Sequence, residues 1–178
     1  MVITIKKIYK IIIAIAIPLL IGAFSFFLTR DAMDLFKMIN KPFLSPPGWL
    51  FPVVWTILYI LIGIASYLIY QNNEYVKTVY RTKALILYGI QLIFNFFWSI
   101  IFFNLKLYIF SSFWLFIMWF LIVLLMYFGG KIDKRVFYLL IPYILWTTFA
   151  GYLNIMIAIL NWRTKNNWQY WINSWIVL

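Results

Sequence analysis

The chain contains neither cysteine nor histidine. Their absence excludes disulfide bonds, thiolate nucleophiles, the usual zinc sites and a histidine ligand for a haem iron. Acidic residues are scarce as well, because four Asp and Glu stand against 15 Lys and Arg, and charged residues make up only 11% of the sequence. A soluble domain is about a quarter charged and about half apolar. With 66% hydrophobic residues, this chain is not a water-soluble fold.

The excess of basic residues does not indicate a nucleic-acid partner. Binding to nucleic acid requires a continuous basic face, whereas nearly all the Lys and Arg residues here lie in short breaks between long apolar runs. That placement is typical of residues that flank membrane spans and contact lipid headgroups. The lipid bilayer is therefore the first partner that the sequence predicts.

Five apolar runs are long enough to cross a bilayer as helices. A helix needs about 20 apolar residues to span a hydrocarbon core of about 30 Å, and the runs are apolar on both phases of a two-residue repeat, which argues against a membrane β-barrel. The sequence predicts an all-α integral membrane protein, a five-helix bundle within residues 1–161. The spans are expected near residues 9–29, 49–70, 84–104, 107–128 and 136–160.

The first connection and the C-terminal tail differ from the short loops. Pro42, Pro46 and Pro47 close the long first connection, and because proline fixes φ and keeps the preceding residue extended, we expect a stiff lid between the first two helices. Residues 162–178 form a Trp-rich tail that is too short and polar to span. The spacing of its Trp residues indicates an interfacial helix. A disordered end with interfacial Trp residues is the alternative.

The charge distribution and composition suggest an orientation and a location. Nine Lys and Arg lie on the N-terminal side and six on the other, and the positive-inside rule then predicts a cytoplasmic N-terminus. The frequent Ile, Lys, Asn, Phe and Tyr residues are typical of an AT-rich bacterial genome. We therefore expect a multi-pass protein of a bacterial plasma membrane.

Apart from Lys10 at the start of the first one, the predicted spans contain no charged residue. Ion pathways, proton relays and voltage sensors use charges within the membrane, so an ion-coupled pump is disfavoured. A buried carboxylate pair and a base for a serine nucleophile are lacking too. The sequence predicts no metal site, no cofactor and no conventional catalytic residues.

A few polar and aromatic residues do enter the spans, and they fall on aligned stripes. Because amides are costly against lipid tails, these stripes should face the inside of the bundle. Aromatic rings beside a few amides suit a flat, largely apolar ligand. The alternative is that these side chains only join and pack helices, which is also the role we expect for Ala14, Pro18, Gly22 and Ser25 on the first span. The candidate residues for binding are Trp55, Tyr59, Gln91, Asn95, Trp98, Ser99, Trp146 and Ala150.

Three segments together resemble the TspO/MBR family, also called the translocator protein or peripheral-type benzodiazepine receptor family. The match covers roughly residues 10–161, and the three segments occur in order in a chain with five predicted spans. The segments are Lys41-Pro42, Pro46-Pro47-Gly48-Trp49, Trp55, Leu58-Tyr59 and Gly63; then Gln91-Leu92, Asn95, Trp98 and Phe102-Phe103; then Pro142-Tyr143, Trp146, Phe149-Ala150 and Leu153-Asn154.

The resemblance implies a five-helix bundle, often dimeric, with a pocket under the first loop for porphyrins, sterols or synthetic ligands. It also implies that the eight candidate residues line that pocket. Leu35, Phe36 and Leu44 stand where many members have lid aromatics, and residues 155–161 lack the Tyr and basic residue of the sterol-recognition pattern. A tetrapyrrole is therefore favoured over a sterol.

Two alternatives from other classes, a transporter and a scaffold, stay open beside a receptor for protoporphyrin-type ligands, and the receptor itself could have a photochemical activity. Some family members degrade bound porphyrin in light, and the Trp residues of the candidate pocket could mediate such a reaction. A transporter or efflux component for hydrophobic small molecules would need the same pocket. A non-catalytic membrane scaffold would use the inward aromatics for packing only.

Overall fold

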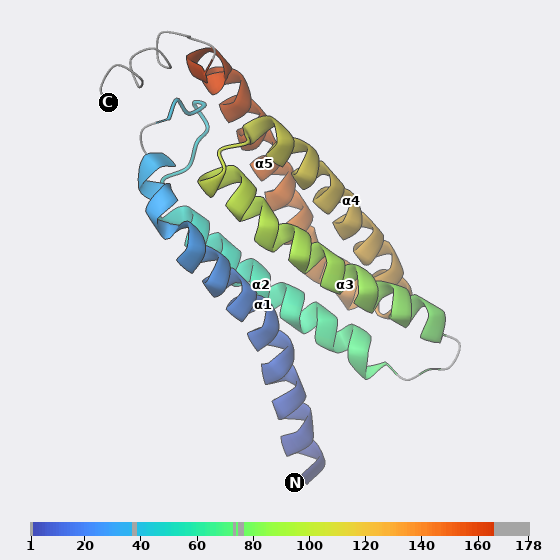
Figure 1. Ribbon diagram of the computed structural model, residues 1–178. Helices are drawn as coiled ribbons and strands as arrows, with labels where there is room; N and C mark the ends of the chain where they lie inside the picture. The colour runs from blue at the N-terminus through green and yellow to red at the C-terminus, as the bar shows by residue number, and fades with distance from the viewer. Residues whose placement is uncertain (1, 37–38, 73, 75–76, 166–178) are drawn as a thin grey trace.

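The protein is a bundle of long helices, as the computed structural model in Figure 1 shows, and the structure describes residues 2–36, 39–72, 74 and 77–165. Within these residues, five helices are long and apolar enough to cross a membrane, so the predicted all-α membrane fold is confirmed. The chain runs through α1 (Val2–Phe36), α2 (Leu50–Gln71), α3 (Thr78–Ser99), a π-helix η2 (Ile100–Asn104), α4 (Tyr108–Ile132) and α5 (Lys134–Lys165).

The helices extend beyond the predicted spans. Helix α1 begins at Val2 and ends at Phe36, and α5 continues to Lys165, because a helix can project past the hydrocarbon core wherever its sequence still favours helical backbone. The backbone of residues 162–165 thus belongs to α5. The rest of the expected interfacial helix, with Trp168, Trp171 and Trp175, lies outside the described residues.

The helices form a closed ring. Helix α1 packs on α2, α2 on α5, α5 on α4, α4 on α3, and α3 with η2 returns to α1. Figure 1 shows α1 and α2 side by side, with the first turns of α1 extending away from the other helices. Phe24 of α1 and Phe96 of α3 stack with ring centroids 5.7 Å apart, a contact between the two helices that close the ring.

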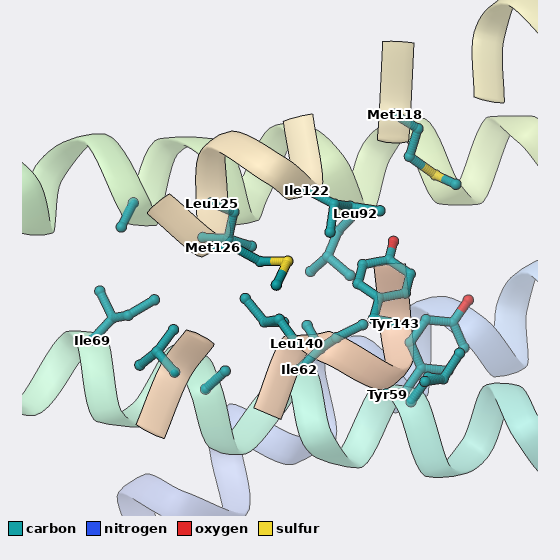
Figure 2. Close-up of a cluster of buried hydrophobic side chains, with 14 of the residues drawn as sticks. Tyr59, Ile62, Ile69, Leu92, Met118, Ile122, Leu125, Met126, Leu140 and Tyr143 are labelled. Atoms are coloured by element: carbon teal, nitrogen blue, oxygen red, sulfur yellow. The ribbon is translucent and has the colours of Figure 1, made fainter. Parts of the chain in front are cut away.

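Aliphatic side chains fill the half of the bundle away from the first loop. Figure 2 shows Ile62 and Ile69 of α2 facing Ile122, Leu125 and Met126 of α4, and the exposed fraction of Ile62, Ile69, Ile122 and Leu125 is 1% or less. Burial from lipid adds little hydrophobic free energy, so close packing is the main source of stability between these helices. The opposite half, near the first loop, is the part that is hollow.

Two glycines allow α1 and α2 to approach closely. A Cβ atom on Gly63 would lie 2.6 Å from the Cα atom of Ile15 and 2.7 Å from the carbonyl oxygen of Ala14. A Cβ atom on Gly22 would overlap the ring of Tyr59. Small residues permit such backbone contacts in membranes, and here they set the position of α1 beside the hollow half.

The turn from α4 to α5 is fixed by Asp133. Its carboxylate accepts a hydrogen bond of 2.9 Å from the backbone N–H of Arg135 and another of 2.6 Å from the Arg135 guanidinium. These hydrogen bonds from Arg135 hold the pKa of Asp133 below its usual value. The carboxylate at the first turn of α5 also complements the positive end of the helix dipole.

Candidate functional site

A cavity of about 610 Å³ lies between α1, α2 and the end of α3 with η2. Its volume falls within the range of about 300–1,000 Å³ that is usual for sites of drug-sized ligands. The described residues around it include no charged side chain. The lining consists of Ala16, Leu19, Leu20, Gly22, Ala23, Ser25, Phe26, Thr29, Phe51, Pro52, Trp55, Thr56, Tyr59, Trp98, Ser99 and Phe103.

Aromatic rings form the inner wall of this cavity. The ring of Trp55 lies 5.6 Å from Tyr59 and 6.3 Å from Trp98, centroid to centroid. Trp98 stacks in turn on Phe102 at 5.4 Å. Aromatic surfaces at these separations attract one another and would attract a flat ring system placed against them. The cavity is therefore suited to a planar apolar molecule.

A chain of hydrogen bonds runs behind this wall. The hydroxyl of Tyr59 donates to Oδ1 of Asn95 at 2.7 Å, and Nδ2 of Asn95 donates to the hydroxyl of Tyr143 at 3.2 Å. Tyr143 donates onward to Oε1 of Gln91 at 2.7 Å. Figure 2 shows Tyr59 and Tyr143 side by side at this end of the core. The two amides thus join α2, α3 and α5 and hold the Tyr59 ring in place.

Trp98 is held by a second buried amide, Asn154 of α5. Its Oδ1 atom accepts hydrogen bonds from Nε1 of Trp98 at 3.1 Å and from the Ser111 hydroxyl at 3.0 Å. Its Nδ2 atom donates to the carbonyl of Tyr108 at 2.7 Å and to the Ser112 hydroxyl at 2.8 Å. All four hydrogen-bonding positions of the amide are occupied, so the orientation of the Trp98 indole is fixed.

The structure divides the eight candidate residues into three groups. Trp55, Tyr59, Trp98 and Ser99 line the cavity, whereas Gln91 and Asn95 lie behind the aromatic wall and are at most 1% exposed. The third group is on α5 and comprises Trp146 and Ala150, which do not line the cavity.

Trp146 packs next to a residue of the lining. Its ring lies 5.9 Å from Phe51, which does face the cavity. The Nε1 atom of Trp146 is buried and has no hydrogen-bond partner. Phe51 and Trp55 therefore stand between the cavity and the α5 side of the expected pocket.

The cavity opens between α1 and α2. The lining residues with exposed side chains are all on these two helices, and Leu20 is 68% and Phe26 is 52% exposed. Ala23, Pro52 and Thr56 complete this rim. Since both helices are spans, the rim faces the hydrocarbon region, and a ligand dissolved in the bilayer can reach the aromatic wall from the side.

The first loop lies at the same end of the bundle as the cavity. Pro42 is buried, Pro46 is half-buried and Pro47 is exposed. The backbone N–H of Asn40 donates to Oδ1 of Asn161 at 3.2 Å, and Nδ2 of Asn161 donates to the Asn40 carbonyl at 2.9 Å. This pair of hydrogen bonds ties the loop to the end of α5, and Figure 1 shows the loop and this end of α5 at the same end of the bundle.

Sequence reasoning missed the contribution of α1 to the cavity. Gly22, Ser25 and Thr29 line it, although the first two were expected only to pack helices. The missed signal was a pair of hydroxyl residues one turn apart in the otherwise apolar run of residues 11–29. The π-helix η2, which brings Phe103 to the cavity, was not predicted either, because its widened turn has no clear sequence signature.

Comparison with known proteins finds a matching family model and several similar proteins. The model of the TspO/MBR family matches residues 14–160. A protein of Chlorobaculum tepidum named tryptophan-rich protein TspO is 34% identical over 88% of this chain and 98% of its own length. A protein of Archaeoglobus fulgidus with the same name is 37% identical over 87% and 99%. The tryptophan-rich sensory protein of Cereibacter sphaeroides is 33% identical over 70% and 75%.

Proposed function

The chain belongs to the TspO/MBR family, and from this premise we propose that it is a membrane receptor for tetrapyrroles of the protoporphyrin type. The observation that carries the proposal is the apolar cavity walled by Trp55, Tyr59 and Trp98. A macrocycle placed in it would lie against the Trp55 ring. The name of the Cereibacter sphaeroides relative, a sensory protein, agrees with a receptor role.

The carboxylates of such a ligand would lie at the loop end of the cavity. Protoporphyrin carries two carboxylates, which are costly to bury in a cavity without charged lining. Arg30 and Lys41 are exposed near the loop end of the bundle, beyond Thr29 at the end of the cavity. We place the carboxylates toward these cations and the macrocycle toward the aromatic wall. Light-dependent breakdown of the bound porphyrin is a further prediction from the family resemblance.

Replacing Trp55 with Phe should weaken protoporphyrin binding about fivefold to tenfold. The substitution removes stacking area from the centre of the wall, and an aromatic contact is worth about 0.5–1.5 kcal/mol beyond its buried area. Trp146→Phe is the matched control, because Trp146 lies behind Phe51 and outside the lining. Titration of the detergent-solubilised protein, followed by porphyrin absorbance, measures both. Equal losses for the two variants would place the ligand on the α5 side.

The tie between the first loop and α5 should slow ligand release. Asn161→Ala removes the two hydrogen bonds to the Asn40 backbone, each worth about 0.5–1.5 kcal/mol. If the loop acts as a lid, dissociation of protoporphyrin should become about fivefold faster, measured by stopped-flow transfer to empty micelles. Gln71→Ala, at the opposite end of α2, is the control. An unchanged dissociation rate would show that the loop is not a lid.

Transport of hydrophobic molecules is the second candidate function. The observation that favours it is the opening of the cavity between α1 and α2, which a carrier in the bilayer would need. Net flux of protoporphyrin across sealed proteoliposomes separates the two functions. A receptor would bind the ligand at the rim and wall and leave the flux at the level of protein-free vesicles.

We also propose a bacterial plasma membrane with the N-terminus in the cytoplasm. The end of the bundle that includes the α2–α3 and α4–α5 connections carries exposed basic residues beside aromatic rings. Lys10 lies 5.5 Å from the centre of the Tyr70 ring, and Lys131 lies 5.4 Å from that of Tyr127. Arg30 lies 4.6 Å from the centre of the Phe27 ring at the other end, so the support for the orientation comes from the excess of Lys and Arg at this end, nine against six.

A further inference from the structure

Ser25 of α1 presents an unused hydroxyl to the cavity. The residue lines the cavity and is 4% exposed. Its Oγ atom is buried and has no hydrogen-bond partner. A buried hydroxyl without a partner costs about 1–3 kcal/mol. The expectation that Ser25 only packs α1 against its neighbours gives no account of this unpaired group.

Four other polar side chains of the lining are already engaged, and the remaining one, Ser99, is only half-buried. Thr29 donates to the carbonyl of Ser25 itself at 2.9 Å, and Thr56 donates to the carbonyl of Pro52 at 2.8 Å. Tyr59 and Trp98 donate to the buried amides of Asn95 and Asn154. A serine within a helix commonly bonds back to a carbonyl of the preceding turn in the same way. Ser25 departs from this pattern, and its hydrogen is free for a molecule in the cavity.

The surroundings define what that molecule must offer. A hydroxyl group that donates needs an acceptor, and a carbonyl oxygen is the common acceptor on an otherwise apolar ring compound. The described lining includes no charged side chain, so a carboxylate beside Ser25 would be buried without a counter-charge, which is strongly unfavourable. A neutral ketone, ester or amide carbonyl meets both conditions.

We propose that the Ser25 hydroxyl is the hydrogen-bond donor that orients the ligand, and that the cavity selects ring-bearing molecules with a neutral carbonyl, an inference that rests on the proposed ligand-binding function. The rings lie against Trp55 and the carbonyl oxygen faces α1. Among tetrapyrroles, the site favours macrocycles with an ester or ketone carbonyl over those with alkyl substituents only. Ser25 is thus a specificity residue, on a helix to which the sequence assigned no binding role.

Two probes of nearly the same shape test the donor. Benzophenone and diphenylmethane have the same two rings and differ in one carbonyl group. Calorimetric titration of the full-length protein in nanodiscs should show that Ser25→Ala weakens benzophenone binding about fivefold to tenfold, the loss expected for one buried hydrogen bond. Diphenylmethane binding should not change. Partition into the lipid is the same for parent and variant and therefore cancels.

A vibrational measurement separates hydrogen bonding from packing. The infrared carbonyl stretch of bound benzophenone should move to higher frequency in Ser25→Ala, because the carbonyl loses its donor. Ser66→Ala is the matched control, since the Ser66 hydroxyl donates to the Gly63 carbonyl at 2.8 Å and does not line the cavity. Ser25→Cys, which keeps the side-chain size but donates weakly, should give an intermediate affinity.

Several results would overturn the assignment. Equal effects of Ser25→Ala on both probes, an unchanged carbonyl stretch, or failure of the parent protein to bind benzophenone would each show that Ser25 is not the donor. The proposed function is tested separately, by titrating protoporphyrin into the parent protein. If Ser25→Ala selectively weakens benzophenone binding but the parent protein does not bind protoporphyrin, Ser25 remains the donor and tetrapyrroles are rejected as the ligand.

Discussion

Gly63→Ala is expected to lower the free energy of unfolding by about 3 kcal/mol, the upper part of the range for overpacking a closely packed interior. The added Cβ atom would lie 2.6 Å from Cα of Ile15 and 2.7 Å from the carbonyl oxygen of Ala14. Both are backbone atoms, so no side-chain rotation relieves the overlap and α1 must move away from α2. The higher helix propensity of alanine, about 1 kcal/mol, offsets only part of this cost.

The same displacement should impair binding. Helix α1 supplies the side of the cavity that includes Gly22 and Ser25, so a shift of α1 changes the distance between Ser25 and the aromatic wall. We expect protoporphyrin affinity to fall at least tenfold in Gly63→Ala. The change should appear even at temperatures where the variant is fully folded, as judged by its circular dichroism.

Gly89→Ala provides the matched control on α3. A Cβ atom at Gly89 would meet no other atom within 4 Å, so only helix propensity acts, and the variant should be equal to the parent or up to about 1 kcal/mol more stable. Thermal unfolding of the parent and both variants in one detergent gives the comparison. Similar midpoints for Gly63→Ala and Gly89→Ala would show that the α1–α2 contact is looser than the structure has it.

Asn154→Leu is expected to cost about 3 kcal/mol of stability, because four hydrogen bonds are lost together. Single side-chain hydrogen bonds between membrane helices average about 0.6 kcal/mol, but this substitution also leaves one buried N–H group without a partner, at about 1–3 kcal/mol. That group is Nε1 of Trp98, whereas the Ser111 hydroxyl keeps its hydrogen bond of 2.9 Å to the Tyr108 carbonyl. Unfolding by a denaturing detergent measures the loss.

The affinity of Asn154→Leu for the ligand should fall together with its stability. The Asn154 amide fixes the Trp98 indole in the cavity wall, and without it the ring can turn away from the ligand. We expect a loss of about tenfold in protoporphyrin affinity, equivalent to about 1.4 kcal/mol. Thr148→Val is the control, because it removes an exposed hydrogen bond of 2.9 Å between Trp119 of α4 and α5, together with the hydrogen bond of Thr148 to the Ile144 carbonyl of its own helix. If both variants bind protoporphyrin as the parent does, Trp98 does not contact the ligand.

The sequence was sufficient to predict the fold class, and the reason is physical. A helix must contain about 20 apolar residues to satisfy its backbone hydrogen bonds inside a bilayer, and five runs of that kind are read directly from the chain. The inward direction of Gln91, Asn95 and Asn154 followed from the cost of an amide against lipid. In the structure all three are at most 1% exposed.

Direction alone does not reveal which neighbour a side chain meets. Tyr59 and Asn95 were both predicted to face inward, yet Tyr59 lines the cavity while Asn95 lies behind it, bonded to the Tyr59 hydroxyl. Trp146 faces a side chain of the lining instead of the cavity itself. Helical spacing gives the angle of a residue around its own axis, whereas depth in the bundle depends on how far each neighbouring helix approaches.

The position of α1 was decided by the tertiary structure. The sequence showed a stripe of small residues on this helix and determined that it packs closely, because only small side chains let helix backbones approach. Which helix it contacts, through Ala14 and Ile15 against Gly63, depends on the ring order of the bundle. The same order makes Ser25 part of a cavity, since an opening between three helices exists only after all three have packed.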